Sequence, residues 1–336
     1  MLSFNEIFAD STKYCKKIKT DEYHETGKNM IVDQGQSEIA GYTDLEEGLF
    51  SDVPAIIFGD HTRIIKYVDK PFFIGADGVK VLKSKLEKAN YRYLYYALKN
   101  VKIPNTGYNR HFKWLKETIF NYPNSDRQQE IVLILDKLQS IITHLRTQLE
   151  KLDLLVKARF VEMFGDPIYN ANNLPMMCLN DLGVWNSGGT PSRTNPAYFT
   201  GEIDWYSAGE LNTLYLEGSI EKITEEAIQE SAAKLFKAGS MLVGMYDTAA
   251  FKMGILKKAS ASNQACACIE PNETVNIVWL YYSLQLMKEH FLSQRRGVRQ
   301  KNLNLGMIKG FEIPIADRGK QDEFVCFAEQ VDKSKV

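Results

Sequence analysis

The sequence lacks the features of secreted, membrane-bound and metal-dependent proteins. No apolar run approaches the length of a membrane span, and residues 1–6 do not begin a signal peptide. Only five cysteines occur among 336 residues, and their positions show no metal-ligand spacing. Cys266 and Cys268 alternate within a strand-like run and are predicted to be buried thiols. These absences favour a globular protein of a reducing cytoplasm, with no membrane partner.

Recognisable catalytic motifs are also absent. The chain contains no Walker A loop, no HExxH zinc motif and no GxSxG nucleophile motif. Residues 195–198 (NPAY) approach the Asn-Pro-Pro-Tyr pattern of amino-methyltransferases, but the second proline is missing, so we interpret them as a turn. Asp60 and His61 are likewise interpreted as part of a hydrogen-bonded turn rather than as an acid–base pair. The pattern indicates a targeting protein whose chemistry is carried out by partner chains.

The clearest positive signal is an internal duplication. Residues 94–98 (LYYAL) recur as residues 280–284 (LYYSL), 186 residues later. In each half an apolar run ending in glycine precedes this segment, and a polar loop that opens with glycine follows it. An Asp-Arg pair then leads into an apolar helix. The separation between corresponding landmarks changes only from 185 to 193 residues along the chain. This order predicts two related domains, each with its own core.

Apolar and alternating runs predict the same order of elements in both halves. The expected strands are 55–59, 64–68 and 79–82 in the first half, and 241–244, 254–257 and 265–270 in the second. The expected helices are 91–100 and 275–291. The predicted fold class is α+β, with two repeated mixed α/β domains joined by a long coiled-coil helix.

A sustained heptad pattern lies between the two halves. Its a/d positions are Ile131, Leu135, Leu138, Ile142, Leu145, Leu149, Leu152 and Val156. Neither Gly nor Pro interrupts residues 126–164, Asp126 is the predicted N-cap, and Gly165 is the predicted stop. A helix of about 38 residues would be roughly 57 Å long and, with so narrow an apolar stripe, would pair with one partner helix. A second copy begins after Asp317 and reaches Val336, so we expect it to cover about half of the seam.

Two basic stretches occupy matching places in the two repeats. No acidic residue occurs between Glu87 and Glu117, or between Glu289 and Glu312. The net charge of −1 argues weakly against a nucleic-acid partner, but these stretches favour a phosphate-contacting surface. Polar loops supply side chains that suit base edges or phosphates. The candidate DNA-binding residues are Arg63, Arg110, His111, Lys113, Thr190, Arg193, Thr248, Arg295, Arg296, Arg299, Gln300, Lys301 and Asn302.

Eight short segments resemble the recognition-domain motifs of the specificity subunits of type I restriction–modification enzymes. In the first half they are residues 31–36 (IVDQGQ), 41–44 (GYTD), 58–63 (FGDHTR) and 107–112 (GYNRHF). In the second half they are residues 187–193 (SGGTPSR), 203–206 (IDWY), 223–228 (ITEEAI) and 303–304 (LN). Their order around the central helix makes the chain similar to this family over essentially its whole length.

The resemblance implies a domain organisation and a function. Residues 1–125 and 165–316 are expected to be target-recognition domains, 126–164 the central conserved spacer helix, and 317–336 the start of a shortened C-terminal conserved helix. The resemblance implies recognition of a bipartite site in double-stranded DNA. It also implies that the helices form an antiparallel pair, which sets the half-site spacing and docks two methyltransferase subunits and the restriction (translocase) subunits. S-adenosylmethionine, ATP and Mg²⁺ are expected on those subunits, and no cofactor, metal or catalytic residue on this chain.

Two other classes of function are compatible with parts of the sequence. A self-contained DNA adenine methyltransferase has residues 195–198 as its only indication, and binding of S-adenosylmethionine by the purified chain would identify it. A coiled-coil protein-interaction scaffold would use the heptad seam alone, and a salt-dependent DNA-binding assay would separate it from a DNA-recognition subunit.

Overall fold

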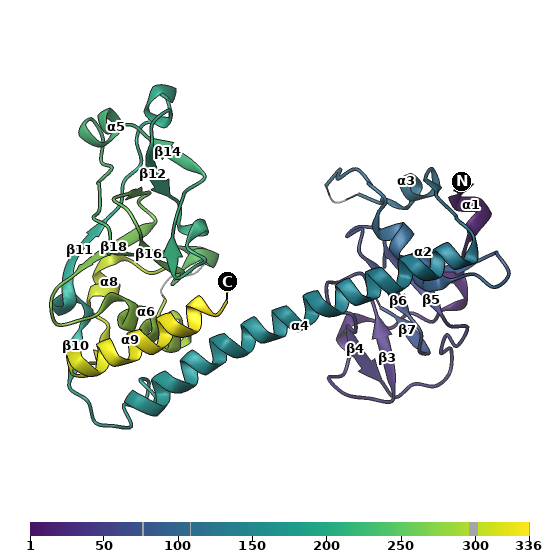
Figure 1. The fold of residues 1–336 in the computed structure, drawn as a ribbon, viewed down its shortest axis with the longest axis horizontal. Helices are drawn as coiled ribbons and strands as arrows, with labels where there is room; N and C mark the ends of the chain where they lie inside the picture. The colour runs from purple at the N-terminus through teal and green to yellow at the C-terminus, as the bar shows by residue number, and fades with distance from the viewer. Residues whose placement is uncertain (76, 108, 296–301, 336) are drawn as a thin grey trace. The chain divides into compact units, whose positions relative to one another are not determined.

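The computed structural model describes residues 1–75, 77–107, 109–295 and 302–335 (Figure 1). The chain divides into two compact units, Met1–Leu145 (unit 1) and Arg146–Val336 (unit 2). The division falls inside one continuous helix, α4 (Ser125–Phe164). In the described part of the chain, no helix has an apolar stretch long enough to cross a bilayer.

In its described residues, unit 1 contains three small sheets and, besides its part of α4, three short α-helices. Its antiparallel four-stranded sheet has the order β2 (Phe8–Asp10), β8 (Val79–Ser84), β5 (Ala55–Gly59) and β6 (Ile65–Val68). Its three-stranded sheet has the order β4 (Gly41–Thr43), β3 (Asn29–Val32) and β7 (Phe72–Ile74), and β1 (Leu2–Ser3) pairs with β9 (Ile119–Phe120). The helices are α1 (Phe4–Ile7), α2 (Tyr91–Lys99) and α3 (Phe112–Lys116).

Unit 2 repeats this arrangement with one added strand. Its five-stranded sheet has the order β11 (Gly183–Ser187), β18 (Cys266–Pro271), β15 (Met241–Gly244), β16 (Met253–Leu256) and β13 (Tyr215–Leu216). Its three-stranded sheet has the order β14 (Glu221–Ile223), β12 (Ile203–Tyr206) and β17 (Ala261–Ser262), and β10 (Met176–Cys178) pairs with β19 (Glu312–Pro314). The helices are α5 (Glu225–Gln229), α6 (Ile277–Leu286), α7 (Lys288–Ser293), α8 (Leu305–Lys309) and α9 (Arg318–Lys333).

The two units share strand order and strand direction. In both three-stranded sheets the central strand is antiparallel to one neighbour and parallel to the other. The parallel register pairs Val32 with Ile74 in unit 1 and Tyr206 with Ser262 in unit 2. The central strands β5 and β15 are fully buried, as expected for apolar strands covered on both faces. The predicted duplication and the predicted α+β fold class are therefore confirmed.

One predicted helix is broken in two. The sequence predicted a single helix over residues 275–291, whereas α6 ends at Leu286 and α7 begins at Lys288. The break at Met287 brings Phe291 into the core, where its ring stacks on Phe311 with centroids 4.3 Å apart. Burial of this aromatic pair outweighs the continuity of the helix.

The long helix α4 starts one residue earlier than its predicted first position. Its first turn is capped by Asn124, whose Oδ1 accepts a hydrogen bond from the Arg127 N–H (3.1 Å). The prediction of Asp126 as N-cap is wrong, because Asp126 already lies in the first turn, where its charge suits the helix dipole. The predicted stop is confirmed: Gly165 has φ 78°, and its N–H donates to the Val161 carbonyl (2.8 Å).

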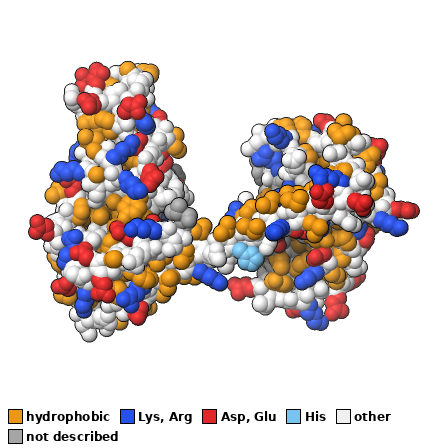
Figure 2. All heavy atoms as spheres, in the orientation of Figure 1, with side chains coloured by type: hydrophobic (Ala, Val, Ile, Leu, Met, Phe, Trp, Pro, Cys, Tyr) orange, Lys and Arg blue, Asp and Glu red, His pale blue; other side chains and the backbone are white. Residues whose placement is uncertain are grey.

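The two ends of α4 pack into different cores. In unit 1, Ile131 packs against the core beside α2, and Asp136 receives hydrogen bonds from Arg92 and Tyr96 of α2. In unit 2, Val156 is 1 % exposed and packs with residues of α6 and α9. The middle of the predicted seam is open to solvent, with Leu145 53 % exposed. Figure 2 shows hydrophobic side chains exposed along the helix.

Helix α9 packs antiparallel on the C-terminal part of α4 within unit 2. The Phe324 ring meets the Phe160 ring edge-on, with centroids 5.2 Å apart. Nearer the end of α9, the Lys335 ammonium lies 2.8 Å from the Asp153 carboxylate. The residue numbers therefore run in opposite directions along the two helices, as expected for an antiparallel pair.

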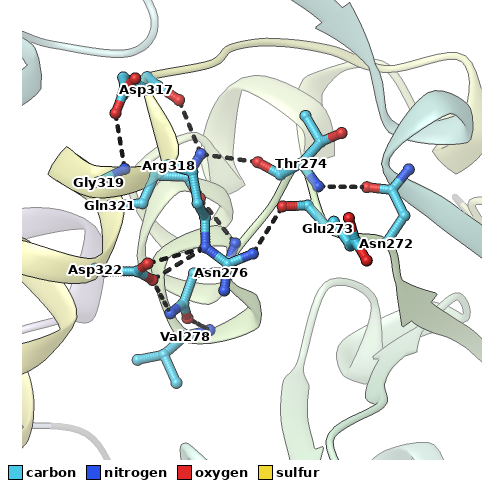
Figure 3. Close-up of polar contacts among 11 residues, drawn as sticks. Asn272, Glu273, Thr274, Asn276, Val278, Asp317, Arg318, Gly319, Gln321 and Asp322 are labelled. Carbon is cyan, nitrogen blue, oxygen red and sulfur yellow. Dashed lines mark hydrogen bonds and ion pairs between the residues drawn. The ribbon is translucent and has the colours of Figure 1, made fainter.

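The start of α9 is joined to the start of α6 by a polar network (Figure 3). The Asn276 N–H donates to Gln321 Oε1 (2.8 Å), and Asn276 Nδ2 donates to Asp322 Oδ1 (2.7 Å). The Arg318 guanidinium pairs with Asp322 (3.0 Å) and donates to the Glu273 carbonyl (2.8 Å). This network orients α9, and so fixes which of its faces meets α4.

Candidate nucleic-acid interface

In unit 1, the loops with candidate DNA-binding residues meet where strand β5 ends. Asp60 follows β5 directly and is 3 % exposed. Its backbone carbonyl accepts a hydrogen bond from the His111 N–H (2.8 Å), and its Oδ1 accepts one from the Phe112 N–H (2.7 Å). Asp60 therefore joins its own loop to the loop that precedes α3. Arg110 and Lys113 are exposed on either side of this junction.

Two of the predicted DNA-binding side chains, His111 and Arg63, instead form hydrogen bonds with backbone carbonyls of this chain. His111 is fully buried, and its Nδ1 lies 2.9 Å from the Asp60 carbonyl, so its prediction as a DNA contact is corrected to a role in holding the loop. Arg63 is half-buried with φ 61°, and its Nη1 donates to the Ile103 carbonyl (3.2 Å). The His111 ring is hydrogen-bonded through Nδ1, while its buried Nε2 has no hydrogen-bond partner among the described residues.

Lysine side chains lie over aromatic rings around α3. Lys113 Nζ is 4.2 Å from the centroid of the Trp114 ring, and Lys116 Nζ is 4.8 Å from that of Phe112. Cation–π contacts of this kind orient the ammonium groups while leaving them exposed to solvent. Basic groups alternating with aromatic side chains are typical of surfaces that contact phosphates.

In unit 2, the equivalent loops meet where strand β15 ends. The Met245 carbonyl accepts a hydrogen bond from the Leu303 N–H (2.8 Å), which matches the Asp60–His111 backbone bond of unit 1. Asn302 Oδ1 accepts a hydrogen bond from the Asp247 N–H (3.0 Å). Thr248 follows Asp247 and is exposed. The structure therefore brings the predicted residues Thr248 and Asn302 together.

The loop with Thr190 reaches the same end of β15 through a third segment. The Met245 N–H donates to the Ala265 carbonyl (2.8 Å), and Thr190 Oγ1 donates to Gln264 Oε1. Gly188 allows this close approach, because a Cβ at this position would lie 2.3 Å from the Asn263 carbonyl oxygen. Thr190 thus belongs to the loop cluster that includes Thr248.

The remaining predicted residues either form contacts outside this loop cluster or lie outside the described part of the chain. Arg193 forms a bidentate pair with Glu221 (Nη2–Oε2 2.7 Å), and its guanidinium lies 4.3 Å from the centroid of the Phe199 ring. Arg295 is half-buried and its Nε donates to the Leu292 carbonyl (2.9 Å). Four predicted residues lie outside the described part of the chain: Arg296, Arg299, Gln300 and Lys301.

The residues that we interpreted as non-catalytic have structural roles. Asn195 Oδ1 accepts a hydrogen bond from the Ala197 N–H (3.2 Å) and caps the 3₁₀-helix Pro196–Phe199, which confirms the predicted turn. Cys266 is buried as predicted, and burial raises the pKa of its thiol to about 12. Within the described ranges, no group of three or more His, Cys, Asp or Glu side chains is placed to hold a metal ion.

Sequence reasoning missed two residues that organise the unit 1 loops. Asp60 was interpreted only as part of a turn, although its buried carboxylate also holds the start of α3. Gln34 lies in the segment that resembles a family motif, but no role was predicted for it. Sequence position could have identified both residues. Each polar side chain lies within two residues of the end of an apolar strand, where loops meet.

The described part of the chain thus contains two copies of one mixed α/β fold, each with loops gathered at the end of its central strand. The family model of the type I restriction modification DNA specificity domain matches residues 4–153 and 173–336. The chain therefore belongs to this family, and it is a specificity subunit that serves DNA sequence recognition.

Individual relatives and solved structures are similar over most of the chain. The EcoR124I/EcoR124II specificity subunit of Escherichia coli is 24% identical over 346 residues, covering 97% of this chain and 84% of that protein. The MjaIX specificity subunit of Methanocaldococcus jannaschii is 26% identical over 150 residues, which is 43% of this chain and 34% of that protein. A type I S subunit from M. genitalium superposes with a TM-score of 0.57 at 15% identity, covering 100% of this chain and 92% of the other.

A structure from a study of type I restriction–modification assembly shares the fold as well. It superposes with a TM-score of 0.52 at 14% identity and covers 98% of this chain and 90% of the other. The similarity to both solved structures extends over the two units and helix α4, so the duplicated fold itself is shared.

Proposed function

We propose that this chain recognises a bipartite site in double-stranded DNA, with one half-site bound by each unit. The observation that carries the proposal is the repeated loop junction. The Asp60 carbonyl and the His111 N–H in unit 1 correspond to the Met245 carbonyl and the Leu303 N–H in unit 2. Each junction lies where the central strand of its unit ends, and we call the loops gathered there the recognition edge of that unit. Two equivalent recognition edges in one chain suit a target that itself has two parts.

Each recognition edge offers exposed groups that suit contacts with DNA. In unit 1 the exposed Arg110 and Lys113 suit phosphate contacts and paired hydrogen bonds to guanine. In unit 2 the exposed Thr248 suits a phosphate, whereas the amide oxygen of Asn302 is occupied by the Asp247 N–H. We place the DNA contacts at the exposed loop residues, because the buried members of each junction are occupied by backbone hydrogen bonds.

The helix α4 is the proposed docking surface for the other subunits. Leu138, Leu145 and Leu149 are 49, 53 and 41 % exposed and lie on one face of the helix, so the helix presents a continuous apolar face. Such a face is unfavourable in water and marks a protein-binding surface. We infer that two methyltransferase subunits bind along α4, that restriction (translocase) subunits join this complex, and that the helix sets the spacing between half-sites.

The chemical steps belong to the partner subunits in this proposal. Family membership supports a non-catalytic subunit of a DNA adenine methyltransferase and type I deoxyribonuclease complex. S-adenosylmethionine is expected in the methyltransferase subunits, and ATP and Mg²⁺ in the restriction subunits. This chain contributes the choice of DNA sequence.

The test is a comparison of methylated DNA in cells that express the methyltransferase subunit with and without this chain. We expect methylated adenines in one motif with two half-sites at a fixed spacing, and their loss when the chain is removed. A continuous motif would contradict the two-part site. S-adenosylmethionine binding by the purified chain alone would contradict the non-catalytic role, and DNA binding that is insensitive to salt would contradict the phosphate-contacting edges.

A further inference from the structure

The side chain of Gln34 lies between three loops at the recognition edge of unit 1. Gln34 comes two residues after strand β3 and is half-buried. Its Oε1 accepts a hydrogen bond from the His61 N–H (3.2 Å), and its Nε2 donates to the Asp77 carbonyl (2.9 Å). Its own backbone carbonyl accepts a hydrogen bond from Thr62 Oγ1 (2.7 Å). One residue therefore holds the loop after β5 and the segment before β8.

The packing around Gln34 leaves little freedom of movement. A Cβ on Gly59 would lie 2.8 Å from the Gln34 Cβ and 2.2 Å from Thr62 Oγ1. Gly78 has φ +88°, and a Cβ there would lie 3.0 Å from Gln34 Nε2. Both glycines allow the neighbouring backbone to approach the amide closely, so the side chain is fixed by packing as well as by hydrogen bonds.

A buried lysine of the four-stranded sheet binds the loop that contains Gln34. Lys66 of strand β6 is 7 % exposed, and its ammonium donates to the Ser37 carbonyl (2.5 Å) and lies 3.6 Å from the Asp33 carboxylate. Burial is the main influence on this ammonium and lowers the pKa of Lys66. A buried charge is tolerated only with such partners, so residues 33–37 have a defined conformation.

The position of Gln34 connects it to the exposed candidate side chains. The His61 and Thr62 that it holds precede Arg63, and Asp60 in the same loop holds the segment with Arg110. The amide of Gln34 is occupied by backbone groups of this chain. Gln34 is thus suited to position the recognition loops rather than to contact a base.

Unit 2 offers no equivalent amide at this position. The parallel registers align Val32 with Tyr206, which places Ala208 where unit 1 has Gln34. A methyl group forms no hydrogen bonds, so the unit 2 loops are held by other contacts, including that of Asn302 with the Asp247 N–H. Loss of the Gln34 contacts should therefore affect one edge only.

We propose that Gln34 is the positioning residue that sets DNA specificity at the half-site bound by unit 1. The proposal rests on the proposed function, and it adds a residue whose effect is confined to one half-site. Gln34→Ala removes both amide hydrogen bonds, and Gln36→Ala is the matched control because Gln36 is exposed on the same loop. Thr62→Val removes the hydroxyl bond to the Gln34 carbonyl with little change in shape.

The experiment measures methylated motifs and thermal unfolding for the full chain with its methyltransferase subunit. Gln34→Ala should reduce discrimination against mismatches in one half-site about tenfold, with the other half-site and the spacing unchanged. Thr62→Val should shift the same half-site to a smaller degree, and Gln36→Ala should match the wild type. A purely structural role would lower the melting temperature without changing the motif.

Three results would overturn the inference. The first is a wild-type motif retained by both Gln34→Ala and Thr62→Val, which leaves the proposed function standing. The second is an equal relaxation of both half-sites. The third is a wild-type chain that directs no sequence-specific methylation, which overturns the proposed function as well. If Gln34→Ala does not fold, Thr62→Val alone decides between the first result and the expected one.

Discussion

Gln128 and Gln321 form the same hydrogen bond in the two halves of the chain. In each case Nε2 donates to the backbone carbonyl five residues earlier, Pro123 or Ala316, at 2.8 Å. Both side chains are buried, at 4 and 0 % exposure. The shared contact shows that the duplication includes the start of each long helix. It also aligns Asn124 with Asp317 as the two N-caps, rather than the Asp-Arg pairs that the sequence aligned.

Gln321→Ala is predicted to destabilise unit 2. The substitution leaves the Asn276 N–H and the Ala316 carbonyl without their side-chain partner in a buried position. Loss of such bonds costs about 1–3 kcal/mol. Chemical denaturation measures the change in free energy of unfolding. Gln330→Ala on the exposed face of the same helix should change it little, and equal effects of the two substitutions would contradict the prediction.

Arg110→Ala and Lys113→Ala are predicted to weaken DNA binding to all sequences. If each side chain contacts one phosphate, each loss should reduce the slope of log affinity against log salt by about 0.9. Titrations of labelled DNA at several salt concentrations measure this slope. Lys28→Ala, which removes the partner of Glu46, serves as the charge-matched control. A slope that stays constant in both variants would remove these residues from the interface.

Glu221→Gln is predicted to strengthen non-specific DNA binding. The carboxylate of Glu221 pairs with Arg193, whose hydrogen bond lowers the pKa of Glu221. The neutral amide would leave the guanidinium free to contact a phosphate, so the salt slope should increase by about one unit. Glu202→Gln, which removes the partner of Lys222, is the control on the same sheet. Unchanged affinity would show that Arg193 does not face DNA.

Leu145→Asp is predicted to weaken binding of the methyltransferase subunit while leaving both units folded. Leu145 is exposed in this chain, so a carboxylate there should change the free energy of unfolding by only about 0.5 kcal/mol. At an interface the same carboxylate would be buried without a partner, which is costly. Leu154→Asp is the control, because nine residues at about 100° each place Leu154 on the opposite face of the helix. Co-purification compares the two variants.

An insertion of four residues after Arg146 is predicted to lengthen the spacing between half-sites. The insertion adds about 6 Å at 1.5 Å per residue, which is roughly two base pairs of DNA. The sequences of the two half-sites should stay the same, since the loops of each unit are untouched. Sequencing of methylated DNA reads both properties together. A motif with the original spacing would show that the helix does not set it.

Sequence reasoning predicted the parts of the fold that depend on local pattern. The strands β5 and β15 were predicted with little or no error because apolar runs bounded by polar loops encode them directly. The broken helix at Met287 was missed because the break depends on where Phe291 stacks, which is a tertiary contact. The N-cap of α4 was misplaced by two residues because both Asn124 and Asp126 are good capping residues.

The candidate interface was predicted only as a set of loops. Polar composition identified the exposed Arg110 and Thr248, but it also selected His111, whose ring is buried against Asp60. Composition does not indicate which polar side chain is buried and hydrogen-bonded to a backbone group. The roles of Asp60 and Gln34 depend on contacts between segments 27 and 52 residues apart, and no local pattern predicts these.

The loop junction of unit 2 has a consequence for how this protein can change during evolution. The bond between the Met245 carbonyl and the Leu303 N–H joins two backbone groups, so it persists whatever side chains the neighbouring positions carry. Mutations at exposed tip residues such as Thr248 can therefore accumulate without loss of the fold. Under the proposed function, a new DNA preference would arise in one unit by a few substitutions, while the other unit and the proposed docking surface of α4 would be inherited unchanged.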